Sequence, residues 1–213
     1  GIPHHPDTKN ALRISPDCCP YERLTCISKI LASHHFYDDQ PEIALRYYRR
    51  LLQMGVNSVE LWNNVGLCCF YAAQYDMTLS CFERALRLAN DDSMADVWFN
   101  IGHVAIGVGD LDMATQAFEI ALSVDNTHPE SFNNLGVLES KKGNYENALG
   151  NFSASSANAD WTHEAFYNRA LLDFKKGDFQ SAFEQVEKSL EAYPEHAEGK
   201  ELRDMLVKQF TVL

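Results

Sequence analysis

Four short strings decide the fold of this chain: Trp62-Asn63-Asn64-Val65-Gly66, Trp98-Phe99-Asn100-Ile101-Gly102, Phe132-Asn133-Asn134-Leu135-Gly136 and Phe166-Tyr167-Asn168-Arg169-Ala170. Their last residues are 36, 34 and 34 positions apart (102−66, 136−102, 170−136). Self-similarity at this period is typical of arrays of helical repeats. The strings therefore predict an all-α solenoid that is built from antiparallel helix pairs.

The composition indicates a folded protein and excludes two classes of partner. The 213 residues are 46% hydrophobic and carry a formal net charge of −12. Phosphate binding needs clustered Lys and Arg residues, which this acidic chain lacks, so we expect no nucleic acid as a partner. No apolar run approaches the roughly 20 residues of a membrane span, so we expect no direct membrane insertion.

The cysteines show no zinc-type spacing, and two pairs are adjacent in the sequence. We expect reduced thiols that pack as small hydrophobic side chains, in a protein of the cytoplasm. The six residues are Cys18, Cys19, Cys26, Cys68, Cys69 and Cys81.

Within each repeat, a small residue on the first helix is expected to face a large ring on the second. Gly66 allows a close approach of the helices, and Phe82 is predicted to pack between them. Glycines in the later turns, such as Gly109, Gly143 and Gly177, supply positive φ at a helix end.

This pattern resembles the tetratricopeptide repeat family, which carries an aromatic residue, Leu-Gly, Ala, Phe, Ala and a closing Pro within 34 residues. The resemblance implies a right-handed superhelix of five repeats, a C-terminal capping helix over residues 197–213, and a tail or remnant of a preceding repeat over residues 1–24. Repeat four departs from the pattern at Ser155-Ser156, so we expect its second helix to pack less well. Repeat five has Arg169 where Leu is usual. The predicted repeats span residues 25–58, 59–94, 95–128, 129–162 and 163–196.

No group of residues in the sequence predicts a catalytic, metal or cofactor site. His34-His35 and Cys26 lack the spacing that would hold a tetrahedral metal. Gly107-Val108-Gly109 is an isolated GxG, not a phosphate-binding loop. The acidic pair Asp91-Asp92 lies in a predicted turn. We therefore expect that the protein is not an enzyme and has no cofactor.

An asparagine occupies the same first-helix position in four repeats, at Asn64, Asn100, Asn134 and Asn168. A side-chain amide both donates and accepts hydrogen bonds, so such a row suits the backbone of an extended peptide in a concave groove. The array of O-linked N-acetylglucosamine transferase is similar in this respect. The alternative is that each asparagine bonds to the adjacent repeat and holds the stack together.

Aromatic and histidine side chains on the first helices are further candidates for partner binding, because aromatic residues dominate interface hot spots. Packing between repeats is the alternative for each of them. They are Phe70, Tyr71, Phe99, His103, Tyr167 and Phe174.

An acidic residue recurs near the start of each first helix, where it favours the helix N-terminus. Tetratricopeptide domains that bind chaperone C-termini clamp a carboxylate with Lys and Arg. Acids in these positions would repel that ligand, so we expect no binding of such tails. The row is Glu60, Asp96, Glu130 and Glu164.

Three stretches resemble a narrower family, the Bardet–Biedl syndrome protein 8 family of BBSome subunits. They are residues 35–55 (HFYDDQPEIALRYYRRLLQMG), 63–72 (NNVGLCCFYA) and 95–105 (ADVWFNIGHVA). Gln40-Pro41 and Cys68-Cys69-Phe70 are not required by the repeat and give the likeness its specificity. The match runs from about Ile30 to the end, the C-terminal part of such a subunit.

The resemblance implies a non-catalytic scaffold in a coat complex that carries membrane proteins to and from cilia. Its partners would be other BBSome subunits, with the tails of membrane-protein cargo as further candidates. It would act in the cytoplasm, at the cilium, at the ciliary base or at centriolar satellites. Two alternatives remain: a peptide-binding adaptor that uses the groove, and the recognition array of a larger enzyme such as a glycosyltransferase.

Overall fold

The computed structural model describes residues 20–159 and 161–212, and the described residues form helices without a strand. The predicted all-α tetratricopeptide class is confirmed. Of the predicted tail, residues 1–19 lie outside the described residues, whereas residues 20–24 belong to the first helix. The helices are α1 (Pro20–Tyr37), α2 (Pro41–Gln53), α3 (Val59–Tyr71), α4 (Tyr75–Leu88), α5 (Asp91–Val108), α6 (Leu111–Val124), α7 (Pro129–Lys142), α8 (Tyr145–Asn158), α9 (His163–Lys176), α10 (Phe179–Ala192) and α11 (Ala197–Val212).

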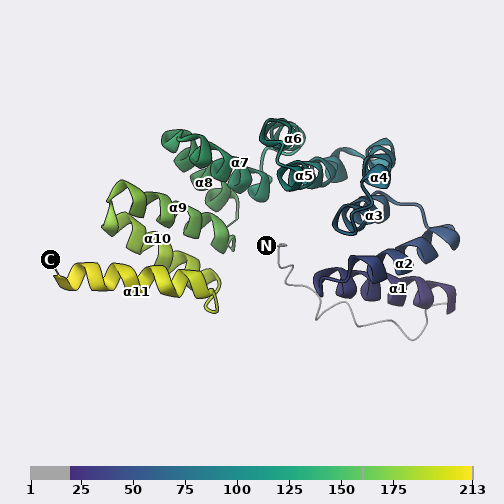
Figure 1. The fold of residues 1–213 in the computed structure, drawn as a ribbon, viewed down its shortest axis with the longest axis horizontal. Coiled ribbons are helices and arrows are strands. Elements are labelled where there is room, and N and C mark those ends of the chain that lie inside the picture. Colours follow the sequence, from purple (N-terminus) through teal and green to yellow (C-terminus); the bar gives the residue numbers. More distant parts are fainter. Residues whose placement is uncertain (1–19, 160, 213) are drawn as a thin grey trace. The chain divides into compact units, whose positions relative to one another are not determined.

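The chain divides into two compact units, with the boundary between Ser93 and Met94. In the first unit α1 packs on α2, α2 on α3, and α3 on α4. In the second unit each helix from α6 to α10 packs on the next helix in the sequence, and α7 also contacts α9. Figure 1 shows how consecutive helices run back and forth inside each unit. The division of the chain into five repeats and a capping helix stays a prediction.

The expected contact between a small residue and a ring is present in both units. A Cβ placed on Gly66 of α3 would lie 3.2 Å from the ring of Phe82 on α4. On Gly102 it would lie 2.5 Å from Phe118, and on Gly136 it would lie 2.6 Å from Phe152. Real Cβ atoms do not come as close as those at Gly102 or Gly136 would, so glycine is what lets these two helix pairs close, whereas a Cβ at Gly66 would make a tight contact.

The turns inside the helix pairs place one residue in the left-handed region. Gly109, Gly143 and Gly177 do so with φ of 83–85°, as the sequence predicts. In the first unit the same position is held by Asp39 (φ 58°) and Ala73 (φ 56°). These five residues are 34, 36, 34 and 34 positions apart (73−39, 109−73, 143−109, 177−143).

The expectation of poorer packing in repeat four is wrong at Ser155. Its side chain is fully buried, and its hydroxyl donates to the carbonyl oxygen of Pro129 at 2.8 Å. Ser189 makes the equivalent bond to the carbonyl of His163 at 2.9 Å. Each hydroxyl donates a hydrogen bond to the other helix of its pair. Both serines therefore pack without the free-energy cost of an unpaired buried polar group.

The C-terminal helix buries only a narrow face. Leu202 and Leu206 of α11 are buried against the core of the second unit, in contact with residues of the Ala182–Val186 segment. Met205 is 50% exposed and Phe210 is 44% exposed. A helix turns 100° per residue, so Met205 lies beside the stripe that Leu202 and Leu206 define.

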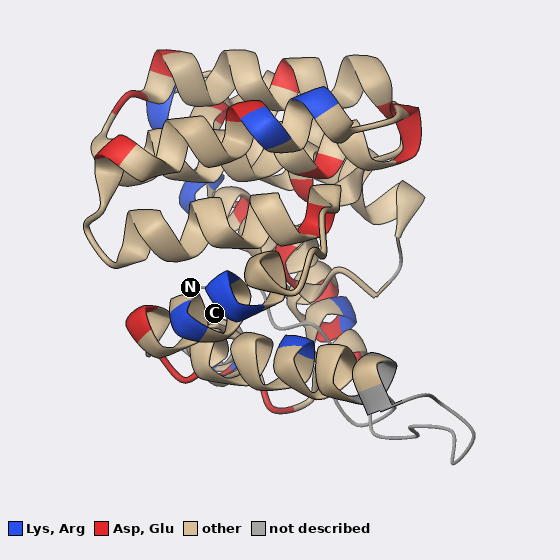
Figure 2. Ribbon diagram, turned by 90° about the vertical axis from the view of Figure 1, so that its right-hand side faces the viewer, with Lys and Arg blue, Asp and Glu red and all other residues tan. Residues whose placement is uncertain are grey.

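The charged residues are scattered over the described helices. Lys and Arg residues occur on several helices in Figure 2, interspersed with Asp and Glu, and they do not gather into a stripe on the face it shows. No helix in the described part is both long and apolar enough to cross a membrane.

Candidate interaction surfaces

Three of the four asparagines in the first-helix row contact the preceding repeat. Asn168 donates through its amide nitrogen to Oδ1 of Asn133 at 2.9 Å, which joins α9 to α7. The amide nitrogen of Asn134 lies 3.1 Å from Nε2 of His103, which joins α7 to α5. Asn64 lies near enough to the phenol of Tyr48 on α2 to lower its pKa slightly, against the larger rise that burial causes. These contacts favour the stack-holding alternative at the three positions.

The row is nevertheless accessible to solvent. All four asparagines, including Asn100, are half-buried rather than buried. An amide has two N–H donors and a carbonyl acceptor, so one inter-repeat bond leaves capacity for another partner. Peptide binding by this row therefore stays a prediction.

His103 is built into the packing of the second unit. Its ring stands 4.6 Å from that of Phe99, edge to face. Burial lowers the pKa of His103, because the charged imidazolium would lose its water. The neutral ring then presents Nε2 as an acceptor for the amide of Asn134.

Three of the aromatic candidates take part in packing within the second unit. Phe99 is only 9% exposed, and its ring lies 5.8 Å from that of Phe118, so it belongs to the core and is closed to a partner. Tyr167 is half-buried against His196, with ring centroids 4.6 Å apart. Phe174 is half-buried beside Phe179 at 5.5 Å.

The remaining two candidates, Phe70 and Tyr71, belong to a row of five rings in the first unit. Tyr71 is 46% exposed and lies 5.3 Å from Phe70, between ring centroids. Phe36 approaches Tyr71 at 5.6 Å, and Tyr75 approaches Phe70 at 5.7 Å. Tyr37 completes the row beside Phe36 at 5.8 Å. Phe36, Tyr37 and Tyr75 were missed because the sequence does not show that the ends of α1 and α3 meet.

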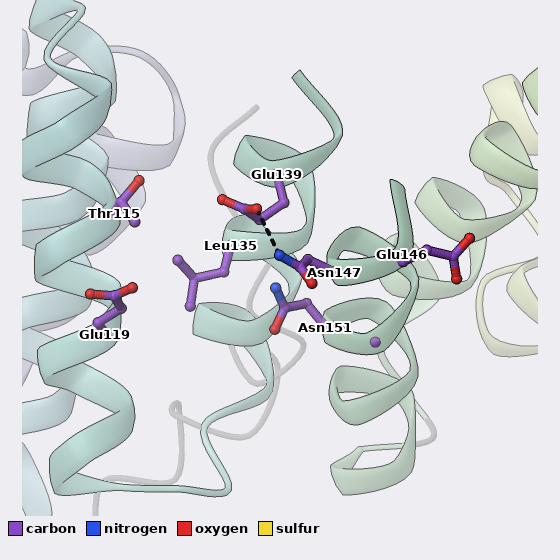
Figure 3. Close-up of a pocket in the computed structure, with 8 residues that line it drawn as sticks. Thr115, Glu119, Leu135, Glu139, Glu146, Asn147 and Asn151 are labelled. Atoms are coloured by element: carbon purple, nitrogen blue, oxygen red, sulfur yellow. Dashed lines mark hydrogen bonds between the residues drawn. The ribbon is translucent and has the colours of Figure 1, made fainter. Parts of the chain in front are cut away.

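A polar pocket of about 460 Å³ lies between α6, α7 and α8 (Figure 3). Glu139, on its wall, accepts hydrogen bonds from the amides of Asn144 at 2.9 Å and Asn147 at 3.4 Å, and pairs with Lys142 at 3.3 Å. These bonds lower the pKa of Glu139, that from Asn144 most strongly. A carboxylate held ionised in this way is a poor general base near neutral pH. The lining residues are Thr115, Glu119, Leu135, Glu139, Glu146, Asn147, Gly150 and Asn151.

The acidic row does not cap every first helix. Helix α5 begins at Asp91, so Asp96 lies beyond its first turn and instead reaches Nε2 of His128 at 3.3 Å. Glu130 lies 3.6 Å from Nδ1 of the same ring. Both Glu130 and Glu164 sit in the first turns of their helices, where the helix dipole favours an acid.

The cysteines of the first unit pack as hydrophobic side chains. Cys68, Cys69 and Cys81 are free thiols buried in its core. Burial raises the pKa of Cys68 to about 12. Among the described residues, no group of three or more His, Cys, Asp or Glu side chains is arranged to hold a metal ion.

Comparisons with known proteins agree with this architecture. The family model described as "Tetratricopeptide repeat" matches residues 95–128 and 163–196, the ranges predicted for repeats three and five. A structure of pilF from Pseudomonas aeruginosa superimposes with a TM-score of 0.70 at 17% identity, covering 91% of this chain and 87% of that one. At such an identity, the match shows a shared fold alone.

Sequence relatives confirm the narrower resemblance. Tetratricopeptide repeat protein 8 of Caenorhabditis elegans is 48% identical over 185 residues, which are 87% of this chain and 36% of that protein. The "BBSome complex member BBS4" of Bos taurus is 24% identical over 64% of this chain and 24% of its own length. The chain spans about a third of the length of the protein 8 relative that it matches.

Proposed function

We propose that this tetratricopeptide repeat chain, a relative of tetratricopeptide repeat protein 8, acts as a protein-interaction scaffold within a BBSome-type complex. The observation that carries the proposal is 48% identity over 87% of the chain, far above what a shared repeat fold alone produces in the 17% match to pilF. A second, weaker relative is itself a BBSome complex member.

The geometry of the described residues suits a scaffold better than an enzyme. The polar pocket between α6, α7 and α8 holds a hydrogen-bonded, ionised carboxylate, Glu139, and its lining residues do not pair a nucleophile with a base. The rings of Tyr37, Tyr71 and Tyr75 instead offer contact area to another protein. We propose a role in carrying membrane proteins to and from cilia, with other subunits of the complex as partners and cargo tails as further ones. The site of action would be the cytoplasm, the ciliary base and the cilium.

Affinity purification from ciliated cells tests this proposal. The tagged chain should recover BBSome subunits in near-stoichiometric amounts, as judged by quantitative mass spectrometry. The matched control is an unrelated tetratricopeptide array with the same tag, which reports capture by helix pairs in general. Equal recovery by both baits, or no recovery by either, would refute the proposal.

A second candidate, a peptide-binding adaptor, is supported by the half-buried amides of the asparagine row. Asn134→Ala and Asn168→Ala separate the two roles of the row, with a labelled Gly-Ser dodecapeptide as the probe of backbone binding. An adaptor loses affinity for the probe while its melting temperature holds. A stack-holding row loses melting temperature, and the wild type does not bind the probe.

A further inference from the structure

We propose that the ring row at the turns of the first unit is a docking surface for a partner segment that carries arginine side chains. The ring row is defined as Phe36, Tyr37, Phe70, Tyr71 and Tyr75. This inference rests on the proposed scaffold function and names the chemistry of one of its partners.

The row is continuous and open to solvent. Its four neighbouring ring pairs are 5.3–5.8 Å apart between centroids, in edge-to-face or tilted arrangements. Tyr37, Tyr71 and Tyr75 are 42%, 46% and 57% exposed. The rings come from α1, α3 and α4, so a single surface spans two consecutive helix pairs. Contiguous exposed aromatic surface of this kind marks interaction sites in soluble proteins.

The repeat does not require tyrosine at these positions. Tyr37 and Tyr71 each stand two residues before the left-handed turn residue, Asp39 or Ala73. The same position in the second unit is held by Gly107, Lys141 and Lys175, which precede Gly109, Gly143 and Gly177. Three other helix pairs fold with Gly or Lys at this position. The fold therefore does not explain why tyrosine stands there in the first unit.

The charge around the ring row also differs from the charge at the ends of α7 and α9 in the second unit. Helices α7 and α9 end in Lys141-Lys142 and Lys175-Lys176, which complement the negative end of the helix dipole. Helix α1 is followed instead by Asp38 and Asp39, and α3 has no basic residue in its last turn. Asp76 adds an exposed carboxylate in the first turn of α4.

Two basic side chains of the first unit already have partners. His34 pairs with Asp38 at 2.8 Å, and Arg49 donates to the side-chain oxygen of Gln74 at 3.1 Å. Two helix C-termini, exposed rings and the exposed acids Asp39 and Asp76 therefore belong to one surface, and this surface lacks the lysines that stand at two of its three counterparts, the ends of α7 and α9. That combination calls for a cation from outside.

Arginine fits this surface better than lysine. Its planar guanidinium stacks on the faces of aromatic rings and pairs with a carboxylate through two parallel hydrogen bonds. The ammonium of lysine is a compact, strongly hydrated charge that does not stack. The surface therefore selects for the shape of the cation as well as for its sign.

Fluorescence anisotropy with the purified chain tests the inference. The probe is a labelled octapeptide in which Arg alternates with Gly, and the comparison peptides carry Lys or Glu in place of Arg. We expect the arginine peptide to bind about tenfold more tightly than the lysine peptide. The glutamate peptide should not bind.

Tyr71→Lys is the decisive variant, because Lys141 and Lys175 occupy that position in the second unit and the fold accommodates them. It should abolish binding of the arginine peptide with an unchanged melting curve. Tyr71→Leu keeps the apolar contact with Phe70 and should weaken binding about tenfold. The matched control is Tyr145→Ala. Tyr145 begins α8 as Tyr75 begins α4, and it is 45% exposed, but it lies outside the ring row.

Equal affinity for the lysine and arginine peptides, or loss of binding in Tyr145→Ala, would overturn the inference. So would a concentration-dependent dimer that Tyr71→Lys dissociates, since the surface would then hold a second copy of the chain. The co-purification experiment separates this from the wider proposal. If BBSome subunits are recovered but the chain shows no preference for arginine peptides, the scaffold proposal is still supported and only the proposal of an arginine-bearing partner is refuted.

Discussion

Both units of this chain contain the same kind of helix pair, but they differ in how much space lies beside the first-helix glycine and in which residues occupy the left-handed turn. In the second unit, glycine occupies every left-handed turn position, and the Gly102–Phe118 and Gly136–Phe152 contacts are too close for a Cβ. The first unit places Asp39 and Ala73 at that turn position, and its Gly66–Phe82 contact is looser by 0.7 Å than that of Gly102 (3.2−2.5). The comparison shows that the space beside Gly102 and Gly136 and the φ of the turn residue are more tightly constrained in the second unit than at the equivalent positions of the first.

The largest expected effect is that of Gly102→Ala. Its Cβ would overlap a ring that is fully buried, so Phe118 or a helix must move, and we expect a loss of about 2 kcal/mol in the free energy of unfolding. Urea denaturation followed by circular dichroism measures it.

Gly66→Ala is the matched control for that substitution. The gain in helix propensity, about 1 kcal/mol, offsets the milder contact with Phe82, so the net change should be close to zero. Equal losses in the two variants would show that the tolerance of the units does not differ.

The next-largest loss of stability is expected at the left-handed turn position. Gly143→Ala puts a Cβ in the left-handed region, where no neighbour lies within 4 Å, so only the backbone strain of about 1 kcal/mol is felt. Thermal melting of the variant should show a corresponding decrease in Tm.

Ala73→Gly is the opposite substitution, from alanine to glycine, at the equivalent turn position of the first unit. It removes the left-handed strain but adds about 0.5–1 kcal/mol of backbone entropy to the unfolded chain, so we expect a gain of a few tenths of a kcal/mol. A loss of stability in Ala73→Gly would contradict the strain argument for both units.

A third difference is the buried carboxyl of Asp173 in the second unit. Asp173 is 6% exposed, its Oδ2 has no hydrogen-bond partner, and Arg169 is 3.8 Å away through Nε. Burial raises the pKa of Asp173, and the guanidinium of Arg169 only partly opposes this. The folded state therefore binds the proton more tightly than the unfolded state does.

It follows that Asp173 stabilises the fold below its ordinary pKa and that this contribution is lost as pH rises through the raised pKa. Asp173→Asn should flatten that slope in stability measured from pH 3.5 to 7, and should gain about 1 kcal/mol at neutral pH. Asp178→Asn is the comparison, because bonds from Ser181 lower the pKa of Asp178 and its slope should have the opposite sign. An unchanged slope in Asp173→Asn would show that this carboxyl is not the source.

Residues within one repeat were predictable from the sequence, and contacts between repeats were less so. The repeat period of 34–36 residues predicted the helix pairs and the glycine turns at Gly109, Gly143 and Gly177, because these features depend on local φ and on spacing. The ring row was seen only through Phe70 and Tyr71, because its other members come from α1 and from the start of α4. Phe99 had the right residue type for a partner contact, but burial is a property of the assembled core and not of the string that contains it.

A further small effect is expected at Ser155, whose side chain both packs in the core and hydrogen-bonds to the neighbouring helix. Repeat three has Ala121 at the position 34 residues earlier (155−121), fully buried, so the site accepts a methyl group in place of the hydroxyl. Ser155→Ala loses only the bond to the carbonyl of Pro129, worth about 0.5–1 kcal/mol. Ser155→Val, by contrast, adds volume to a closed site and should cost more than the alanine variant. Hydrogen exchange at the start of α7 measures both, and a larger loss in Ser155→Ala than in Ser155→Val would mean that the bond, rather than the packing, fixes the second helix of this repeat.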